Sequence, residues 1–243
     1  MTVEKARRRG KGKVRVTAGD QKETPSTGSA SADAARRFYR SDSQAGFYAT
    51  DRFSGRRKGT DSRDKRALER ALDFLGIEGH VLDCPCGAGR ITPVLSARGL
   101  EITGMDVSLQ MLKQAAGHRE PYRAVQGDAL ALPFRDRSFS AVVSMRFLYH
   151  LGTREERVRA LAEMSRVSKR YLVVSFFDSR TLQSLEKRLK VLAGRKPALR
   201  VEINRSQFER EAEMGGWKVL RYFPTLRWIS QHTIAALERT QTG

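Results

Sequence analysis

The stretch VLDCPCGAGR at residues 81–90 decides the fold, and it allows three interpretations: a metal site, a redox pair or a turn that holds a nucleotide. Only one residue separates Cys84 from Cys86, whereas zinc sites use wider spacings and need a second ligand pair. A redox motif has two residues between its cysteines. The chain holds two cysteines and four scattered histidines. We therefore expect no metal, and we expect both cysteines to be small packing residues.

The nucleotide turn fits the neighbouring residues better. The apolar segment HVLDC reads as a short strand containing Asp83, and Gly87 and Gly89 follow it. Glycines allow a backbone to approach a ligand closely because no side chain intervenes. Asp106 ends the next apolar segment, 19 positions after Gly87, which matches the spacing of about 20 residues for a carboxylate that binds ribose hydroxyls. In the other interpretation Asp83 only caps the following helix.

Strand and helix patterns alternate along the rest of the chain. Periodic apolar residues predict helices at 62–75, 89–98, 108–116, 154–168, 182–192 and 206–214. Short apolar runs between them predict strands, and RYLVVSFF at 170–177 is apolar as in a central parallel strand. Two final strands joined by a short link at 224–226 suggest an antiparallel pair. The expected fold is α/β: a Rossmann-like, doubly wound, mostly parallel seven-stranded sheet with an antiparallel edge hairpin and helices on both faces.

The charge is large and uneven. The net charge is +19, and residues 1–66 carry 18 basic against 8 acidic residues. This excess is either a solvated surface or a site for phosphates, nucleic acid or anionic lipid. We expect a disordered basic tail at 1–33 and a single domain at 34–243, made of a helical cap (34–75), a cofactor-binding core (76–178) and a C-terminal part with a basic insertion and edge strands (179–243). With no spanning segment and no secretory signal, a cytoplasmic location is predicted.

Four segments together carry a family resemblance: VLDCPCGAGR, GMDVSLQMLKQA, VQGDALALPFRDRSFSAVVSMRFLYHL and YLVVSFFD. In this order and spacing they resemble class I S-adenosylmethionine-dependent methyltransferases, in the small-molecule branch of the ubiquinone and menaquinone biosynthesis type (methyltransferase type 11). The resemblance covers about residues 81–178 and departs at Pro85, where the family commonly has glycine. It implies an enzyme that binds S-adenosyl-L-methionine and transfers its methyl group.

The resemblance also implies residue roles. Asp83, Gly87 and Gly89 would surround the amino-acid end of the cofactor, and Asp106 would bind both ribose hydroxyls. Met111 would pack near the adenine, Asp128 and Ala129 would meet its amino group, and Met145 would line the floor near the methyl group. The remaining members of the expected cofactor set are Pro85 and Val107.

For catalysis, the resemblance points to the loop MRFLYHL, where a sheet of this kind binds its ligands. His150 is a candidate proton acceptor, or it only binds backbone. Arg146 could bind an acidic group of the substrate or the cofactor carboxylate. The acceptor site is expected to use Tyr149 together with Tyr48 and Arg52, which lie in an aromatic segment that forms either a lid or a packing layer.

The acceptor is expected to be a small or lipid-like molecule. The segment SMRFLYHL lacks the Asn/Asp-Pro-Pro-aromatic pattern of amino-group methylation, and it lacks a cysteine for covalent cytosine chemistry. Two alternatives stay open: an RNA methyltransferase that uses the basic tail, which is not favoured, and a non-catalytic binding subunit. The sequence leaves the acceptor, the methylated atom, the need for a base and the oligomeric state undetermined.

Overall fold

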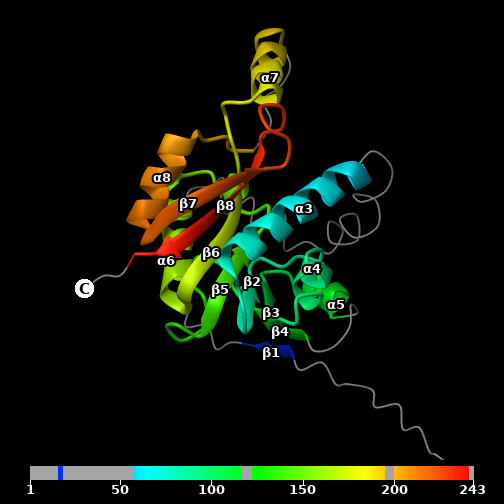
Figure 1. The fold of residues 1–243 in the computed structure, drawn as a ribbon, viewed down its shortest axis with the longest axis vertical. Coiled ribbons are helices and arrows are strands. Elements are labelled where there is room, and N and C mark those ends of the chain that lie inside the picture. Colours follow the sequence, from blue (N-terminus) through cyan, green and yellow to red (C-terminus); the bar gives the residue numbers. More distant parts are fainter. Residues whose placement is uncertain (1–15, 19–56, 117–121, 195–199, 241–243) are drawn as a thin grey trace, which may run out of the picture.

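The computed structural model describes residues 16–18, 57–116, 122–194 and 200–240. Within these ranges one sheet has eight strands in the order β1-β4-β3-β2-β5-β6-β8-β7 (Figure 1). The strands are β1 (Val16–Ala18), β2 (His80–Asp83), β3 (Glu101–Asp106), β4 (Tyr122–Gln126), β5 (Phe139–Ser144), β6 (Ser168–Phe177), β7 (Trp217–Pro224) and β8 (His232–Arg239).

The predicted sheet is confirmed, and β1 adds an eighth strand to it. Strands β1 to β6 pair in parallel. Strand β8 runs antiparallel between β6 and β7, with Phe177 opposite His232. Strand β1 lies inside the segment predicted to be a disordered tail and pairs with β4 at Val16 and Ala124. The other predicted segment boundaries before residue 57 lie outside the described residues.

Helices cover both faces of the sheet, as the alternating pattern predicted. They are α3 (Arg57–Leu75), α4 (Thr92–Ser96), α5 (Leu109–Ala115), the 3₁₀ turn η1 (Leu148–His150), α6 (Arg154–Val167), α7 (Leu182–Leu192) and α8 (Arg205–Met214). Helix α3 packs on β6, β7 and β8, α4 packs on β3, and α5 packs on β3 and β4. Helix α6 packs on β5 and β6 and contacts α8, which packs on β7, in a second core on the other face.

Two predicted boundaries were wrong. The helix expected at 89–98 covers only Thr92–Ser96, because Gly87 and Gly89 have positive φ values and keep the preceding chain in turns. The link expected at 224–226 covers residues 225–231, because β8 begins at His232. Its backbone closes locally, with the Ser230 N–H donating to the Leu226 carbonyl at 3.1 Å. Among the described residues, no helix has the length and apolar character needed to cross a bilayer.

Candidate functional site

The turn after β2 is tied to the end of β3 by one carboxylate. The Gly87 N–H donates to Asp106 Oδ2 at 2.9 Å, and the Ser108 N–H donates to Asp106 Oδ1 at 2.9 Å. The Cys86 N–H also donates to the Met105 carbonyl at 2.8 Å. Burial raises the pKa of Asp106, against the lowering effect of the backbone donors. The two carboxylate oxygens offer about four acceptor sites in all, so the group can still accept from a ligand diol.

Asp83 supplies a second carboxyl group at this edge, at the end of β2. It is 1% exposed, and neither of its side-chain oxygens has a hydrogen-bond partner among the described residues. Burial raises its pKa well above the usual value; Arg90 opposes this shift and Asp106 adds to it. A buried polar group without a partner is costly unless a ligand satisfies it. The orphaned oxygens therefore fit the ammonium group of an amino-acid ligand such as the methionine end of the predicted cofactor.

The two glycines of the turn have different roles. At Gly89, with φ of 75°, an added Cβ would lie 3.2 Å from Ala115 Cα and 3.2 Å from Thr92 Oγ1, so the turn packs tightly on α5. At Gly87, with φ of 55°, an added Cβ would meet no atom of the described residues within 4 Å. Gly89 thus fixes the turn against the protein, while Gly87 leaves its outer side open to a ligand.

The other predicted cofactor residues lie along the same carboxyl edge. Met111 is buried in the first turn of α5, whose N-cap is Ser108. Asp128 follows β4 and accepts the Leu130 N–H at 2.9 Å, beside the buried Ala129. Met145 follows β5 and is buried in the core. The structure also places Pro85 in the turn, after a cis Cys84–Pro85 bond, and Val107 directly after β3. The sheet brings these segments together because β4, β3, β2 and β5 are neighbours.

Both cysteines are buried and neither forms a disulfide, which agrees with the predicted packing role. Cys84 lies in one core and Cys86 in the other. Burial raises the pKa of the Cys84 thiol well above its usual value, and the nearby carboxylates add to the shift. Within the described ranges there is no group of three or more His, Cys, Asp or Glu residues suited to a metal ion.

Arg146 is held in an unusual conformation directly beyond β5. Its φ of 61° lies in the left-handed region, which costs free energy for a residue with a side chain. Its N–H donates to Ser175 Oγ at 2.6 Å. Its guanidinium donates through Nε to Asp64 Oδ2 at 2.9 Å, and a second guanidinium nitrogen donates to the same oxygen. The predicted catalytic Arg146 is therefore occupied by a carboxylate from α3.

Asp64 is the centre of a buried cluster that the sequence analysis missed. It is fully buried in α3 and pairs with Arg146, with Arg90 at 3.4 Å and with His232 Nδ1 at 2.8 Å. Burial alone would raise its pKa, but His232, Arg146 and Arg90 outweigh burial and hold the pKa of the carboxyl well below its usual value. Asp64 is therefore ionised at neutral pH. Arg90 is the last residue of the turn VLDCPCGAGR, so it links this turn to the cluster around Asp64. It also pairs with Asp61 at 2.7 Å.

His232, at the start of β8, has one ring nitrogen bound and one available. Its side chain is buried, and Nε2 has no hydrogen-bond partner among the described residues. Burial lowers the pKa of His232 below its usual value, against the raising effect of Asp64. The imidazole is thus neutral at pH 7 and donates from Nδ1 to the Asp64 carboxylate, which leaves a lone pair on Nε2. An oriented neutral imidazole of this kind can accept a proton.

The predicted substrate residue Tyr149 lies beside this histidine. Its ring stacks on Phe177 with centroids 3.9 Å apart, and it lies 6.4 Å from the His232 ring. His150 is next to it, with its ring centroid 4.5 Å from that of Tyr149. The other predicted substrate residues, Tyr48 and Arg52, lie outside the described residues. A local sequence signal pointed to His150, whereas no local signal marks His232, which meets Asp64 across 168 residues.

Comparisons with known proteins agree with this geometry. A family model described as "Methyltransferase domain" matches residues 82–173. A demethylmenaquinone methyltransferase of Renibacterium salmoninarum is 40% identical over 90 residues, which is 37% of each chain. A probable tRNA methyltransferase 9B of Mus musculus is 34% identical over 111 residues, covering 44% of this chain and 24% of that protein. The chain thus spans well under two thirds of the length of these curated relatives.

Solved structures extend the similarity beyond the matched segment. The magnesium protoporphyrin IX methyltransferase of Synechocystis, solved with bound SAH, aligns with a TM-score of 0.69 at 16% identity, covering 86% of this chain and 99% of that one. At that identity the likeness shows the fold. The CcbJ methyltransferase of Streptomyces caelestis aligns with a TM-score of 0.60 at 14% identity, covering 81% and 96%.

The sheet order and the glycine turn with its facing carboxylate define a Rossmann-like α/β protein with a nucleotide-cofactor edge. The part of the chain that matches the methyltransferase-domain model, residues 82–173, contains this edge. The resemblance to class I S-adenosylmethionine-dependent methyltransferases is confirmed.

Proposed function

We propose that this protein is an S-adenosylmethionine-dependent methyltransferase acting on a small or lipid-like acceptor. The observation that carries the proposal is the carboxyl edge where Asp106 binds the Gly87 and Ser108 N–H groups beside the orphaned carboxyl of Asp83. Asp106 would hold the ribose and Asp83 the ammonium group. The bound cofactor supplies a methyl group on a positively charged sulfur, so the protein mainly has to align the acceptor and exclude water.

His232 is the residue best placed to take a proton from the acceptor. Nε2 carries the lone pair, and Asp64 fixes the tautomer and the orientation of the ring through Nδ1. Burial lowers the pKa of His232, and Arg146, which also positions Asp64, lowers it further, so the imidazole is neutral and can accept a proton. A base is needed only when the acceptor atom carries a proton that is hard to lose, such as a phenol or an activated carbon acid. His232 thus replaces His150 as the leading candidate.

The acceptor class rests on weaker support. The demethylmenaquinone methyltransferase relatives favour a lipid-like acceptor. The tRNA methyltransferase 9B relatives and the net charge of +19 favour RNA as the second candidate. The match to each relative lies within less than half of this chain, so it reports on the cofactor side more than on the acceptor. A cytoplasmic location stays a prediction.

Methyl-labelled cofactor and a panel of quinols, phenols, lipids and RNA test the proposal. We expect transfer to one acceptor class, and loss of cofactor binding in the variant Asp106→Ala. Deletion of residues 1–15, which removes basic residues and keeps strand β1, separates the two candidates, because RNA methylation would weaken and lose its salt dependence while small-molecule turnover would barely change. Failure of the intact chain to bind the cofactor would contradict the proposal and favour a non-catalytic binding subunit.

A further inference from the structure

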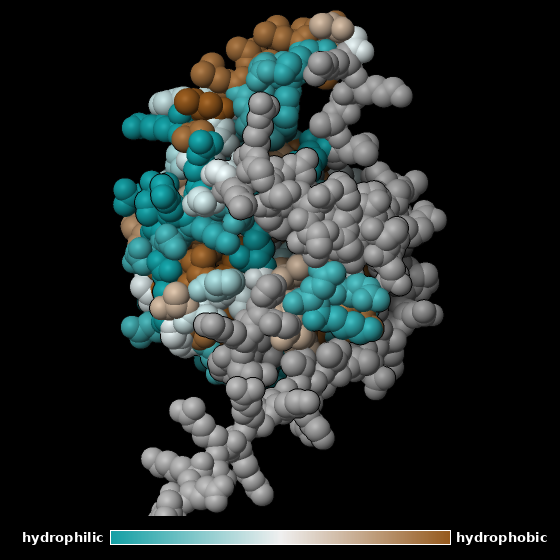
Figure 2. Space-filling view, turned by 90° about the vertical axis from the view of Figure 1, so that its right-hand side faces the viewer, coloured by the Kyte–Doolittle hydropathy of each residue, from teal (hydrophilic) through white to brown (hydrophobic). Residues whose placement is uncertain are grey.

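Helix α7 exposes a stripe of leucines to solvent. Leu182, Leu185, Leu189 and Leu192 are 60%, 53%, 57% and 84% exposed, and Ser184 is the one buried residue of the helix. Their spacing of three and four residues places them along one side of the helix. The helix stands away from the body at the top of Figure 1, and apolar side chains gather at the same place in Figure 2. Contiguous exposed apolar surface of this kind marks an interaction site.

The loop between β7 and β8 extends this apolar stripe. Trp228 and Ile229 are 70% and 53% exposed. Their carbonyls accept the backbone N–H groups of Leu182 at 3.0 Å and Gln183 at 3.1 Å, so the loop is attached to the first turn of α7. We call the four leucines together with Trp228 and Ile229 the apolar rim. It comes from two segments that are far apart in sequence and joined by backbone hydrogen bonds.

Basic side chains flank the apolar rim. Helix α7 carries Lys187, Arg188 and Lys190. Lys187 is paired with Glu202 at 2.9 Å, and Lys190 is paired with Glu186, the single acidic residue of the helix. The Arg227 guanidinium lies 5.6 Å from the centre of the Trp228 ring. An amphipathic helix with basic residues beside its apolar side, extended by a tryptophan, has the composition of segments that lie in the interface of anionic bilayers.

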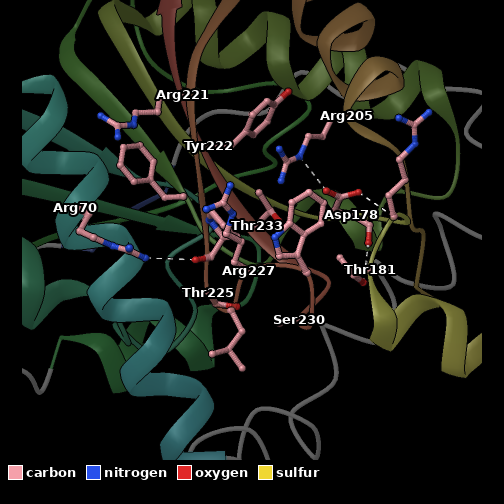
Figure 3. A pocket seen from close by; sticks show the side chains of 15 residues that line it. Arg70, Asp178, Thr181, Arg205, Arg221, Tyr222, Thr225, Arg227, Ser230 and Thr233 are labelled. Atoms are coloured by element: carbon pink, nitrogen blue, oxygen red, sulfur yellow. Dashed lines mark hydrogen bonds and ion pairs between the residues drawn. The ribbon is translucent and has the colours of Figure 1, made fainter.

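An arginine-rich cleft opens at the same loop. Its volume is about 810 Å³, and its lining includes Trp228 of the apolar rim together with five arginines, Arg70, Arg180, Arg205, Arg221 and Arg227 (Figure 3). One lining carboxylate, Asp178, pairs with Arg205 at 3.0 Å. The lining therefore has a net charge of +4. Guanidinium groups bind phosphate oxygens in pairs of parallel hydrogen bonds, so the cleft suits phosphate groups.

We propose that α7 and the loop at 225–231 form a docking surface for an anionic phospholipid bilayer. The apolar rim enters the interface between headgroups and acyl chains, and the arginine-rich cleft binds lipid phosphates. A second copy of the chain fits less well, since packing two leucine stripes together brings the lysines and arginines of both copies close. RNA could bind the basic side chains through its phosphates, but it would leave the leucines of the apolar rim exposed to water. The proposal goes beyond the proposed function and does not depend on the identity of the acceptor.

Vesicle co-sedimentation of the full chain tests the proposal. We expect binding to vesicles of equal parts phosphatidylcholine and phosphatidylglycerol, weaker binding to phosphatidylcholine alone, and loss of affinity as salt rises. The double variant Leu185→Glu, Leu189→Glu should lower the affinity at least about tenfold, because both leucines would otherwise be buried in the interface. The control Met214→Glu, Leu220→Glu replaces two exposed apolar residues outside the surface and should bind as the parent does.

Tryptophan fluorescence gives an independent readout. Trp217 is buried, so a blue shift of the emission on adding anionic vesicles reports Trp228, and Trp228→Phe should abolish it. The proposal is overturned if the parent ignores both vesicles, or if the leucine and control variants lose affinity equally. It is also overturned if the leucine variant abolishes a dimer instead, or if RNA oligonucleotides bind and the vesicles do not. Cofactor titration in the absence of vesicles tests the proposed function separately, so either proposal can fail alone.

Discussion

The two halves of the sheet build their parts of the site in different ways. On the side of β2, β3 and β4, the key contact is Gly87 to Asp106, which are 19 residues apart. On the side of β5, β6 and β8, Asp64 meets Arg146 across 82 residues and His232 across 168. The first contact joins the turn after β2 to the end of the next strand along the chain. The second depends on which strands helix α3 covers. After the proposed function, we call these two parts the cofactor half and the acceptor half. The contacts of the first can be predicted from the sequence, whereas those of the second are seen only in the tertiary structure.

The largest expected effect is on stability and belongs to the acceptor half. Replacement of Asp64 by Ala leaves Arg146 and His232 without their buried partner, and breaking a buried ion pair costs about 3–5 kcal/mol. Urea denaturation measures the free energy of unfolding. Asp73→Ala on the same helix removes an exposed pair with Arg98 and should cost about 0–1 kcal/mol. Equal losses in both variants would mean that the cluster is not a buried centre.

The next effect is on catalysis. We expect His232→Asn to lower kcat by about 100-fold or more for an acceptor that must lose a proton. Cofactor affinity should be unchanged, which separates a lost base from a damaged pocket. The variant His150→Asn is the matched control and should keep most of the activity. If instead His150→Asn removes the activity and His232→Asn keeps it, the loop histidine is the base and the two halves differ less than we argue.

A smaller effect is expected at the cofactor. Asp106→Asn should raise the Kd for S-adenosylmethionine by about 10- to 100-fold, because hydrogen bonds to an ionised group contribute about 1.5–3 kcal/mol. Isothermal titration measures this affinity. Asp136→Asn, at an exposed carboxylate paired with Arg166, should leave it unchanged. Unchanged affinity in Asp106→Asn would show that the ribose binds elsewhere and that the motif predicts the wrong role for Asp106.

The smallest effect is the pH dependence of stability. Because the pKa of folded His232 is below its value in the unfolded chain, its contribution to stability is full above the unfolded pKa of about 6.5 and is lost as the pH falls through the folded pKa. The groups that face the His232 ring are Asp64, Arg146, Arg90 and Tyr149. All four are present in both the parent and His232→Asn, so the comparison between the two proteins isolates His232. The difference in unfolding free energy between the two proteins should therefore shrink on acidification from pH 8 to pH 5. A constant difference would mean that His232 does not titrate there.

Local patterns predicted the fold well. Apolar runs and helical periods located the sheet, its two covered faces and the antiparallel final strands. The errors lie where backbone geometry overrides composition: the glycine turn shortened the helix at Thr92–Ser96, and the apolar run LRWIS forms a loop. Strand Val16–Ala18 lies within the segment expected to be a disordered tail, because three residues carry almost no periodic signal.

The candidate site was predicted only in part, for a physical reason. Asp83, Gly87, Gly89 and Asp106 belong to segments that the family motif identifies. Asp64 lies in a helix whose sequence, RKGTDSRDKRALERALDFL, contains many charges of similar appearance. Nothing local distinguishes the one carboxylate that becomes buried from those that stay in water, since burial is decided by the strands that the helix covers. In the sequence His232 is likewise one of four histidines with no distinguishing signal. Its position is determined by the pairing of β8 with β6, which places it opposite Phe177.

The reversed direction of β8 has a consequence for how such a protein can diversify. Since β8 runs opposite to β6, it delivers His232 from its first residue, at the rim where β6 ends. The proposed proton acceptor is thus held by the pairing of β8 with β6, while the seven residues just before it form the loop between β7 and β8. Both ends of that loop hold the His232 backbone, because Ser230 Oγ accepts the His232 N–H at 3.2 Å and the Thr225 N–H donates to the His232 carbonyl at 3.2 Å. The residues that can vary without touching these bonds are therefore 226–229. New surfaces can therefore be acquired at this part of the hairpin while the proposed proton acceptor keeps its position.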